Sequence, residues 1–328
     1  MTPSRLHILL VRLLFLLLAA GLSLGGCSGP GGVPGTATMP DVALTDGGGA
    51  TASPDGEPPL TFGILYPMVN DSYEMITERA EEAAARHNIR LLVQAPDEAN
   101  LEQQIRMMEM MIKRGVDGIA IAPVDSQALA GVINKAAAQG IPVVCFESDS
   151  PGSQRDAYIG ADNQATGEVI GRTVDRLLSG KGMILVESGM SRMQSTRERL
   201  HGLQNYLYRH TEIDVLEVRH NDGSEELAAR QLEQMISDHP HFSALVNLDF
   251  VSSASSVLVW KAKGLKRFNI ALGLTPALKQ AMDNGQITRI ISQNEQNWGE
   301  EIIGALLLRA RGFEAAERVD TEIRMMGE

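Results

Sequence analysis

Cysteine is nearly absent from this sequence, which contains only Cys27 and Cys145 among its 328 residues. Cys27 closes an N-terminal apolar stretch that reads as an export signal, and Cys145 lies in a short apolar run that is expected to be a buried strand. No pair is then left for a disulfide, and a cluster of metal-binding thiolates is excluded. Cys145 is expected to be a small core residue, as free cysteines usually are.

Positive charge is also scarce: the sequence has 29 lysines and arginines but 41 aspartates and glutamates, which gives a net charge of −12. No block of basic residues occurs beyond the N-terminus, so the sequence does not predict nucleic-acid binding. The apolar fraction of 44% and the chain length support a sizeable core in one large domain or two ordinary ones.

Catalytic and nucleotide-binding signatures are missing too: there is no Gly-x-Ser-x-Gly, no Walker loop and no complete G-x-G-x-x-G after a strand. The seven histidines lack metal-ligand spacing. Asp125, Glu147 and Asp249 could be imagined as acid and base, but nothing pairs them with a nucleophile, and such carboxylates suit a hydroxyl-binding pocket equally well. Neither an enzyme nor a bound cofactor or metal is expected.

The N-terminus carries the one long apolar run. Arg5 and Arg12 precede the apolar stretch Leu13 to Leu24 and make the start of the chain positively charged. This stretch has about 12 residues, or ~18 Å of helix, which is short of a ~30 Å membrane span. Residues 1–26 are therefore expected to be a signal peptide. The run Leu24-Gly-Gly-Cys27 resembles a bacterial lipobox, in which the cysteine is diacylated and becomes the new N-terminus. The alternative is an ordinary or uncleaved signal with a chance cysteine.

Residues 27–60 are rich in Gly, Pro, Ser, Thr and Asp and show no apolar period. Such a segment cannot bury enough surface to offset its ordering entropy, so a disordered tether is expected. The protein is predicted to be exported and held at a bacterial membrane by acyl chains.

The central stretch Gly115 to Val144 reads as strand, loop, helix, turn and strand. Residues 116–122 form a short apolar run that Pro123 ends, and Asp125 or Ser126 can cap the following helix. Gly140 stops that helix before the next strand at 141–146. One βαβ unit of this kind implies a parallel sheet covered by helices.

Strands and helices alternate on both sides of this unit. The remaining strands are expected at 61–68, 89–95, 183–187, 215–219, 244–248, 270–274, 287–292 and 319–325. The remaining helices are expected at 74–87, 101–114, 167–178, 196–209, 227–237, 255–263 and 298–311. This alternation predicts doubly wound parallel sheets. The methionines of 101–114 and Trp298 are expected to pack in the core, the alternatives being a ligand-binding methionine patch and a ring that stacks on the ligand.

The run GVDGIAIAPVDSQAL followed by GIPVV resembles the ribose- and galactose-type substrate-binding proteins of ABC transporters. The resemblance continues through 158–167, 195–202 and 291–293, and it covers roughly residues 61 to 328. It implies an α/β fold of the periplasmic binding protein-like I type, with two doubly wound parallel-sheet lobes joined by a three-crossing hinge. The crossings are expected near 161–163, 291–294 and 317–321. The first lobe is expected to take 61–160 plus 294–312, and the second 161–293 plus 313–328.

The resemblance also implies ligand contacts. Asn70 matches an amide that bonds sugar hydroxyls, Tyr73 matches a stacking aromatic, and Arg197 matches a guanidinium that reaches the ligand from the second lobe. The other expected contacts are Asp125, Glu147, Asp249 and Gln293, and the expected hinge residues are Asp162 and Asn163. Asn70 could instead cap the next helix, and Arg197 could form a surface salt bridge. Arg199 lies on another face of the same helix.

Four positions depart from the family pattern. Ser72 and Gly223 stand where aromatics are common, Ser148 replaces an arginine and Thr275 replaces an aspartate. These changes remove typical sugar contacts, so the sequence does not name the ligand.

The expected function is extracytoplasmic capture of a small polar ligand, carbohydrate-like or a polyol, between two closing lobes for an ABC importer. The expected partners are an ABC permease and, through the lipid anchor, a membrane, with the protein itself a monomer. The alternative is a receptor subunit for a histidine kinase or chemoreceptor. DNA-binding repressors share the fold, but a leader peptide replaces their N-terminal helix-turn-helix.

Overall fold

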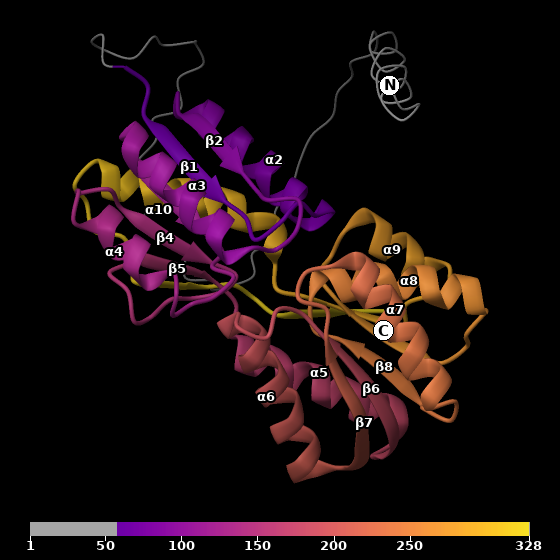
Figure 1. Ribbon diagram of the computed structural model, residues 1–328. Coiled ribbons are helices and arrows are strands. Elements are labelled where there is room, and N and C mark those ends of the chain that lie inside the picture. Colours follow the sequence, from indigo (N-terminus) through magenta and orange to yellow (C-terminus); the bar gives the residue numbers. More distant parts are fainter. Residues whose placement is uncertain (1–57, 328) are drawn as a thin grey trace, which may run out of the picture. The chain divides into compact units, whose positions relative to one another are not determined.

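Two six-stranded sheets organise residues 58–327, the part of the chain that the computed structural model describes (Figure 1). The predicted signal peptide, Cys27 and nearly all of the predicted tether lie outside these residues. Helices cover both sheets, which confirms the predicted α/β class with two doubly wound lobes. Within residues 58–327, every helix is too short or too polar to cross a membrane.

The first sheet holds β1 (Thr61–Leu65), β2 (Arg90–Gln94), β3 (Gly118–Ile121), β4 (Val143–Phe146), β5 (Ala157–Gly160) and β11 (Arg318–Asp320). Its strand order is β11-β5-β4-β3-β1-β2, and all its pairs are parallel. Its helices are α2 (Asp71–Arg86), α3 (Leu101–Arg114), α4 (Ala130–Ala137) and α10 (Trp298–Ala310). Helix α10, from the end of the chain, packs against α2 and strands β3 to β5 (Figure 1).

The second sheet holds β6 (Lys181–Ser188), β7 (Glu212–His220), β8 (Ala244–Asn247), β9 (Phe268–Leu272), β10 (Arg289–Ser292) and β12 (Arg324–Met326). Its order is β12-β10-β9-β8-β6-β7, and only the β10–β12 pair is antiparallel among the described strands. Its helices are α5 (Asn163–Leu178), α6 (Gln194–His210), α7 (Glu225–Asp238), α8 (Phe250–Lys263) and α9 (Pro276–Asp283). A short 3₁₀ helix, Glu295–Asn297, precedes α10.

Two features differ from the sequence-based expectation. The single strand expected at 319–325 is two short strands, and β11 pairs with β5 of the first sheet although residues 313–328 had been assigned to the second lobe. Edge strands of three residues show no periodic pattern, so their sheet could not be read from the sequence. Helix α9 was not expected; its signal was Thr275, whose hydroxyl caps the helix, followed by Pro276 at the first turn.

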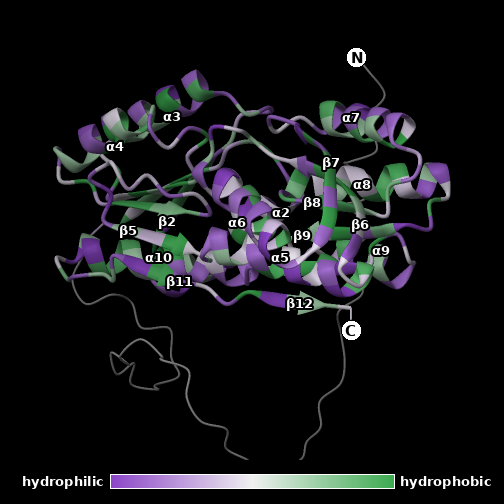
Figure 2. Cartoon of the chain, turned by 90° about the horizontal axis from the view of Figure 1, so that it is seen from below, coloured by the Kyte–Doolittle hydropathy of each residue, from purple (hydrophilic) through white to green (hydrophobic). Residues whose placement is uncertain are grey.

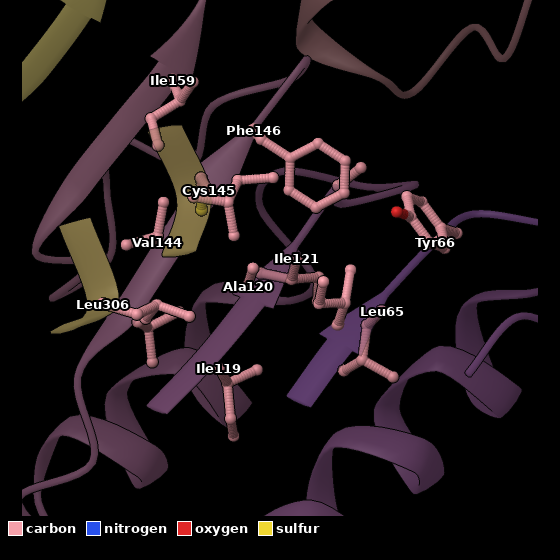
Figure 3. Packing of buried hydrophobic residues seen from close by; sticks show 14 of the residues in the cluster. Leu65, Tyr66, Ile119, Ala120, Ile121, Val144, Cys145, Phe146, Ile159 and Leu306 are labelled. Carbon is pink, nitrogen blue, oxygen red and sulfur yellow. The ribbon is translucent and has the colours of Figure 1, made fainter. Parts of the chain in front are cut away.

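Buried apolar strands make the core of the first lobe. Figure 3 shows Ile119, Ile121, Val144 and Phe146 of these strands, and Leu306 of α10, among the buried residues of this cluster. Cys145 is fully buried there as a free thiol, which confirms its expected core position. The helices that cover the sheets carry hydrophobic residues on one face and hydrophilic residues on the other (Figure 2).

The methionine-rich helix α3 packs in this core, as expected, with Met108, Met111 and Ile112 buried. Its Gln104 is also fully buried and was not anticipated. The amide of Gln104 donates to the carbonyl of Ala122 at 2.9 Å and accepts from the backbone N–H of Val124 at 3.0 Å. This side chain therefore fixes the loop that follows β3.

Helices α5 and α6 approach each other unusually closely. A methyl group added at Gly202 of α6 would lie 2.1 Å from the carbonyl oxygen of Gln164, and one added at Gly167 of α5 would lie 2.1 Å from that of Arg199. Only glycine permits backbones to approach to this distance. The two glycines therefore set the rotation of α6 and with it the direction of its inward side chains.

Candidate functional site

Loops and helix starts beyond the carboxyl ends of strands in both sheets enclose a small cavity of about 10 Å³, roughly the space of one water molecule. The first lobe lines it with Met68, Tyr73 and Glu147. The second lobe lines it with Gly189, Met190, Met193, Thr196, Arg199, Asp249 and Phe250. Three of the sequence-predicted ligand contacts, Tyr73, Glu147 and Asp249, are therefore brought together here.

Glu147 directly follows β4 and has a φ of +60°, a left-handed conformation that is strained for a glutamate. Its carboxylate is 4% exposed and accepts a 2.7 Å hydrogen bond from the hydroxyl of Tyr73. Burial raises the pKa of Glu147 above its usual value, although Arg199 and the Tyr73 hydroxyl oppose this shift. The fold holds this carboxylate at a cost in both solvation and backbone strain, which is typical of a functional group.

Aromatic rings join the two lobes beside Glu147. Tyr73 stacks on Tyr66 with ring centroids 4.9 Å apart, and Tyr66 meets Phe146 edge to face at 5.5 Å. Tyr73 also meets Phe250 of the second lobe at 5.8 Å. The cavity therefore presents both aromatic surface and carboxylates, a combination that suits small polar ligands with some apolar surface.

Arg199, and not Arg197, is the arginine that lines this cavity, so Arg197 does not lie where the resemblance implied. Arg197 is exposed and donates to the carbonyl of Arg192 at 2.8 Å. Arg199 is fully buried, with Nη2 3.9 Å from Oε1 of Glu147 in the other lobe. Residues two apart on a helix point in nearly opposite directions, and the buried positions Thr196, Arg199 and Leu203 share one face.

The remaining donors of Arg199 hold it in place. Nη1 donates to Oε1 of Gln293 at 3.3 Å, and Nη2 donates to the hydroxyl of Ser195 at 3.2 Å. Gln293 in turn donates to the side chains of Asn163 at 3.0 Å and Thr166 at 2.9 Å. Gln293 thus positions Arg199 at the crossings between the lobes rather than lining the cavity itself.

The predicted hinge residues lie at the start of α5. Asp162 caps this helix by accepting from the backbone N–H of Ala165 at 2.9 Å. Asn163 is buried and donates to the backbone carbonyl of Glu147 at 3.3 Å and to the Tyr158 hydroxyl at 3.2 Å. A hinge role for both residues stays a prediction.

Asp249 caps α8 with its carboxylate, which accepts from the backbone N–H groups of Val251 and Ser252. The same carboxylate accepts from the Asn221 amide at 3.1 and 3.2 Å. Burial raises the pKa of Asp249, against the effect of these hydrogen bonds and of Arg199. Gly189 lets the β6 loop pass close by, because an added methyl group there would lie 2.9 Å from Cβ of Asp249.

Two polar groups at the cavity lack partners within the described part of the chain. They are the hydroxyl of Thr196 and Nε of Arg199, both buried. Buried donors and acceptors are nearly always hydrogen-bonded, so unpaired ones beside a cavity mark a place for a ligand group or an ordered water molecule. Thr196, Arg199, Phe250 and the three lining methionines were all missed by the sequence-based reading.

Asn70 and Asp125 do not line the cavity. Asn70 caps α2 by accepting from the backbone N–H of Ser72 at 2.9 Å, and it borders a separate groove of about 360 Å³ that is open to solvent. Asp125 caps its own loop through the N–H groups of Gln127 and Ala128 and forms a 3.4 Å ion pair with Arg192 of the other lobe. Both short side chains are engaged by adjacent backbone, and a ligand contact by either residue stays a prediction.

The four residues that differ from the family pattern each occupy a different structural position. Ser72 is buried in α2 and Thr275 caps α9. Ser148 accepts across the lobes from the backbone N–H of Ser195 at 3.3 Å. Gly223 has a φ of +84°, and a methyl group there would lie 2.8 Å from Sδ of Met68, so no aromatic fits in this arrangement. Trp298 lies in the core and not in the cavity.

Among residues 58–327 no group of histidine, cysteine, aspartate and glutamate side chains could hold a metal ion. The cavity lining itself supplies hydrogen-bonding groups, charge and aromatic contact.

The comparisons with known proteins agree with this architecture. A family profile described as a periplasmic binding protein domain matches residues 62–312. The chain is 24% identical over 188 residues to the ribose import binding protein of Bacillus subtilis, and the match covers 57% of this chain and 60% of that protein. It is 21% identical over 274 residues to the ribose import binding protein of Escherichia coli, covering 82% and 88%.

The matches to solved structures cover a larger share of both chains than the match to the Bacillus subtilis protein does. The solute-binding protein of an ABC transporter from Burkholderia graminis, in complex with D-arabinose, matches with a TM-score of 0.79 and 22% identity over 84% of this chain and 97% of that one. One from Agrobacterium vitis with bound D-fucose matches with a TM-score of 0.79 and 20% identity, covering 82% and 95%. The matches to the first curated relatives span only about three fifths of those proteins, 60% and 62%.

Proposed function

Because this chain belongs to the periplasmic binding protein family, whose members are binding proteins and not enzymes, we propose that it captures a small hydroxyl-bearing solute, a sugar or polyol, outside the cytoplasm. The observation that carries the proposal is the pair of unpaired buried groups, Thr196 Oγ1 and Arg199 Nε, at a cavity shared by both lobes. Ligand hydroxyls can both donate and accept, so they can complete both groups.

Delivery to an ABC importer is part of the proposal. The curated relatives named above are import binding proteins, which favours import over sensing by a kinase or chemoreceptor. Contacts across the lobes, such as Ser195 N–H to Ser148 Oγ and Arg192 to Asp125, would break when the lobes part and form when they close. Closure around the ligand would change the surface offered to a permease.

The proposal predicts that ligand compacts the protein. A thermal-shift screen of sugars and polyols identifies a ligand, and small-angle X-ray scattering then compares the radius of gyration of the protein with and without it. We expect a smaller radius with saturating ligand for the wild-type protein and no change for Arg199→Ala at the same concentration. An unchanged wild-type radius would contradict closure.

We further propose that Cys27 is the lipid attachment site, on the basis of the Leu24-Gly-Gly-Cys27 run. Cys27→Ala should leave an unprocessed precursor or move the protein to the soluble fraction. Cys145→Ala is the matched control, because Cys145 is a buried core thiol and its loss should leave anchoring intact. Mass spectrometry of the mature N-terminus decides the matter, and an unacylated terminus at another residue would disprove it.

A further inference from the structure

The cavity holds more negative than positive charge. Glu147 and Asp249 line it from opposite lobes, and Arg199 is its one cationic side chain among the described residues. Arg199 is not committed to either carboxylate: its nearest approach to Glu147 is 3.9 Å, and its hydrogen bonds go to Gln293 and Ser195. With both carboxylates ionised, the closed cavity would carry one uncompensated negative charge, which either a bound proton or a bound cation can cancel.

A third buried carboxyl lies beneath the site. Glu187, at the end of β6, is fully buried, and neither of its carboxyl oxygens has a hydrogen-bond partner. Burial and the nearby charge of Asp249 raise the pKa of Glu187 to about 9, so it is protonated at neutral pH. The fold thus neutralises one carboxyl beneath the site, but Tyr73 and Asn221 hold the two lining carboxylates as hydrogen-bond acceptors.

From this arrangement we propose that the ligand is a hydroxylated amine bound as a monocation, its ammonium group paired with Glu147 and Asp249 and its hydroxyls completing Thr196 Oγ1 and Arg199 Nε. The inference rests on the proposed solute-binding function and specifies the class of solute. A neutral polyol can donate hydrogen bonds to both carboxylates, but a proton must then cancel the charge in the desolvated site. A single ammonium group cancels it.

The apolar lining supports the same ligand. The ring of Tyr73 packs against that of Phe250, and both border the cavity together with three methionine thioethers. Aromatic faces attract cations, and they attract them most strongly where water is excluded. Carboxylates beside aromatic rings therefore form a site suited to an ammonium group.

Proton linkage gives the inference a signature that a neutral sugar lacks. Glu147 faces Tyr73, Arg199, Asp249 and Glu295, and Asp249 faces Arg199, Glu187 and Asn221. Burial raises the pKa of both carboxyls, and a bound ammonium would lower it again. Binding should therefore release protons, and affinity should rise with pH above the usual carboxyl range until the amine itself deprotonates.

The test uses matched probes on the full-length mature protein. Isothermal titration calorimetry compares D-glucosamine with D-glucose and N-acetyl-D-glucosamine, and D-galactosamine with D-galactose and N-acetyl-D-galactosamine. In at least one series we expect the amine to bind at least tenfold more tightly than its neutral relatives. Repeating the titration in two buffers of different ionisation enthalpy should reveal proton release.

Charge-neutralising variants locate the amine. Glu147→Gln and Asp249→Asn keep side-chain size, and each should reduce the preference for the amine over the neutral sugar at least tenfold. Glu74→Gln is the control, because Glu74 is an exposed carboxylate one residue beyond Tyr73 on the same helix. Thermal unfolding of each variant verifies that it is folded.

Each outcome separates the two proposals. A neutral sugar that binds as tightly as its amine analogue overturns the hydroxylated amine and leaves solute binding intact. An amine preference that survives both substitutions overturns the assignment to Glu147 and Asp249. If the wild-type protein binds no member of the panel, amine or neutral, the amine inference is overturned. The proposed function is overturned separately, by an unchanged scattering radius in a wider screen of sugars and polyols.

Discussion

Arg199→Ala is expected to weaken ligand binding by about tenfold to a hundredfold. The guanidinium is fully buried at the cavity, and its Nε, which has no partner among the described residues, is the donor that a ligand hydroxyl would complete. Losing a hydrogen bond to a charged group costs about 1.5–3 kcal/mol. At about 1.4 kcal/mol per factor of ten, this loss is about one to two orders of magnitude in the dissociation constant.

Arg197→Ala is the matched control, since it removes the same side chain from the same helix. Arg197 is exposed and bonds only a backbone carbonyl of its own loop in the described structure, so affinity should stay within about twofold, as surface contacts contribute little. Arg199→Lys keeps the charge but loses the planar fork, and intermediate affinity is expected. Calorimetric titration of all three variants would reveal the opposite order if Arg197 were the ligand-binding arginine.

Gly202→Ala should lower the free energy of unfolding by about 1–3 kcal/mol, despite the better helix propensity of alanine. The added methyl group would lie 2.1 Å from the Gln164 carbonyl oxygen, and backbone on both sides leaves nothing flexible to yield. Helices α5 and α6 must then separate, which shifts Arg199 away from Gln293. Ligand affinity should fall together with stability.

Gly304→Ala is the control for the glycine effect. Gly304 is also inside a helix, α10, but nothing lies within 4 Å of an added methyl group. Here the entropy of the unfolded chain and the helix propensity both favour alanine, so we expect the free energy of unfolding to rise by about 0.5–1 kcal/mol. Chemical denaturation with both variants measures the difference, and equal stabilities would contradict the tight α5–α6 contact.

The sequence predicted the fold class because each buried strand is a short apolar run and each helix carries a periodic apolar face. The Gly115 to Val144 unit appears in the structure as β3, α4 and β4 with parallel pairing. Helix α9 was missed since its eight residues give only two buried positions, Leu278 and Ala281. The three-residue strands β11 and β12 are defined by their partners and not by their own composition.

The candidate site was predicted less well, because ligand contacts depend on helix rotation and loop closure. Tyr73, Glu147 and Asp249 follow strands directly, so their positions follow from topology alone. Choosing between Arg197 and Arg199 requires the rotation of α6. The spacing of Thr196, Arg199, Leu203 and Leu207 at helical intervals contained that information, since these four residues share the buried face.

Other contacts could not be predicted from any local pattern. Asn70 and Asp125 are polar residues at helix starts, where capping and ligand binding favour the same residue types. Only the backbone N–H groups within reach decide between the two roles. The pairing of Ser148 with Ser195 crosses between lobes and likewise depends on the closed arrangement.

The division of the last residues between the two sheets has a consequence for how the chain is made. The first sheet lacks its edge strand and a covering helix until α10 and β11 are present, and the second lacks its edge strand until β12 is. If the chain is exported N-terminus first, as the proposed function implies, neither lobe can be completed until residues 298–326 have passed the membrane. Late completion of long-range contacts slows folding, which favours transfer of an unfolded polypeptide.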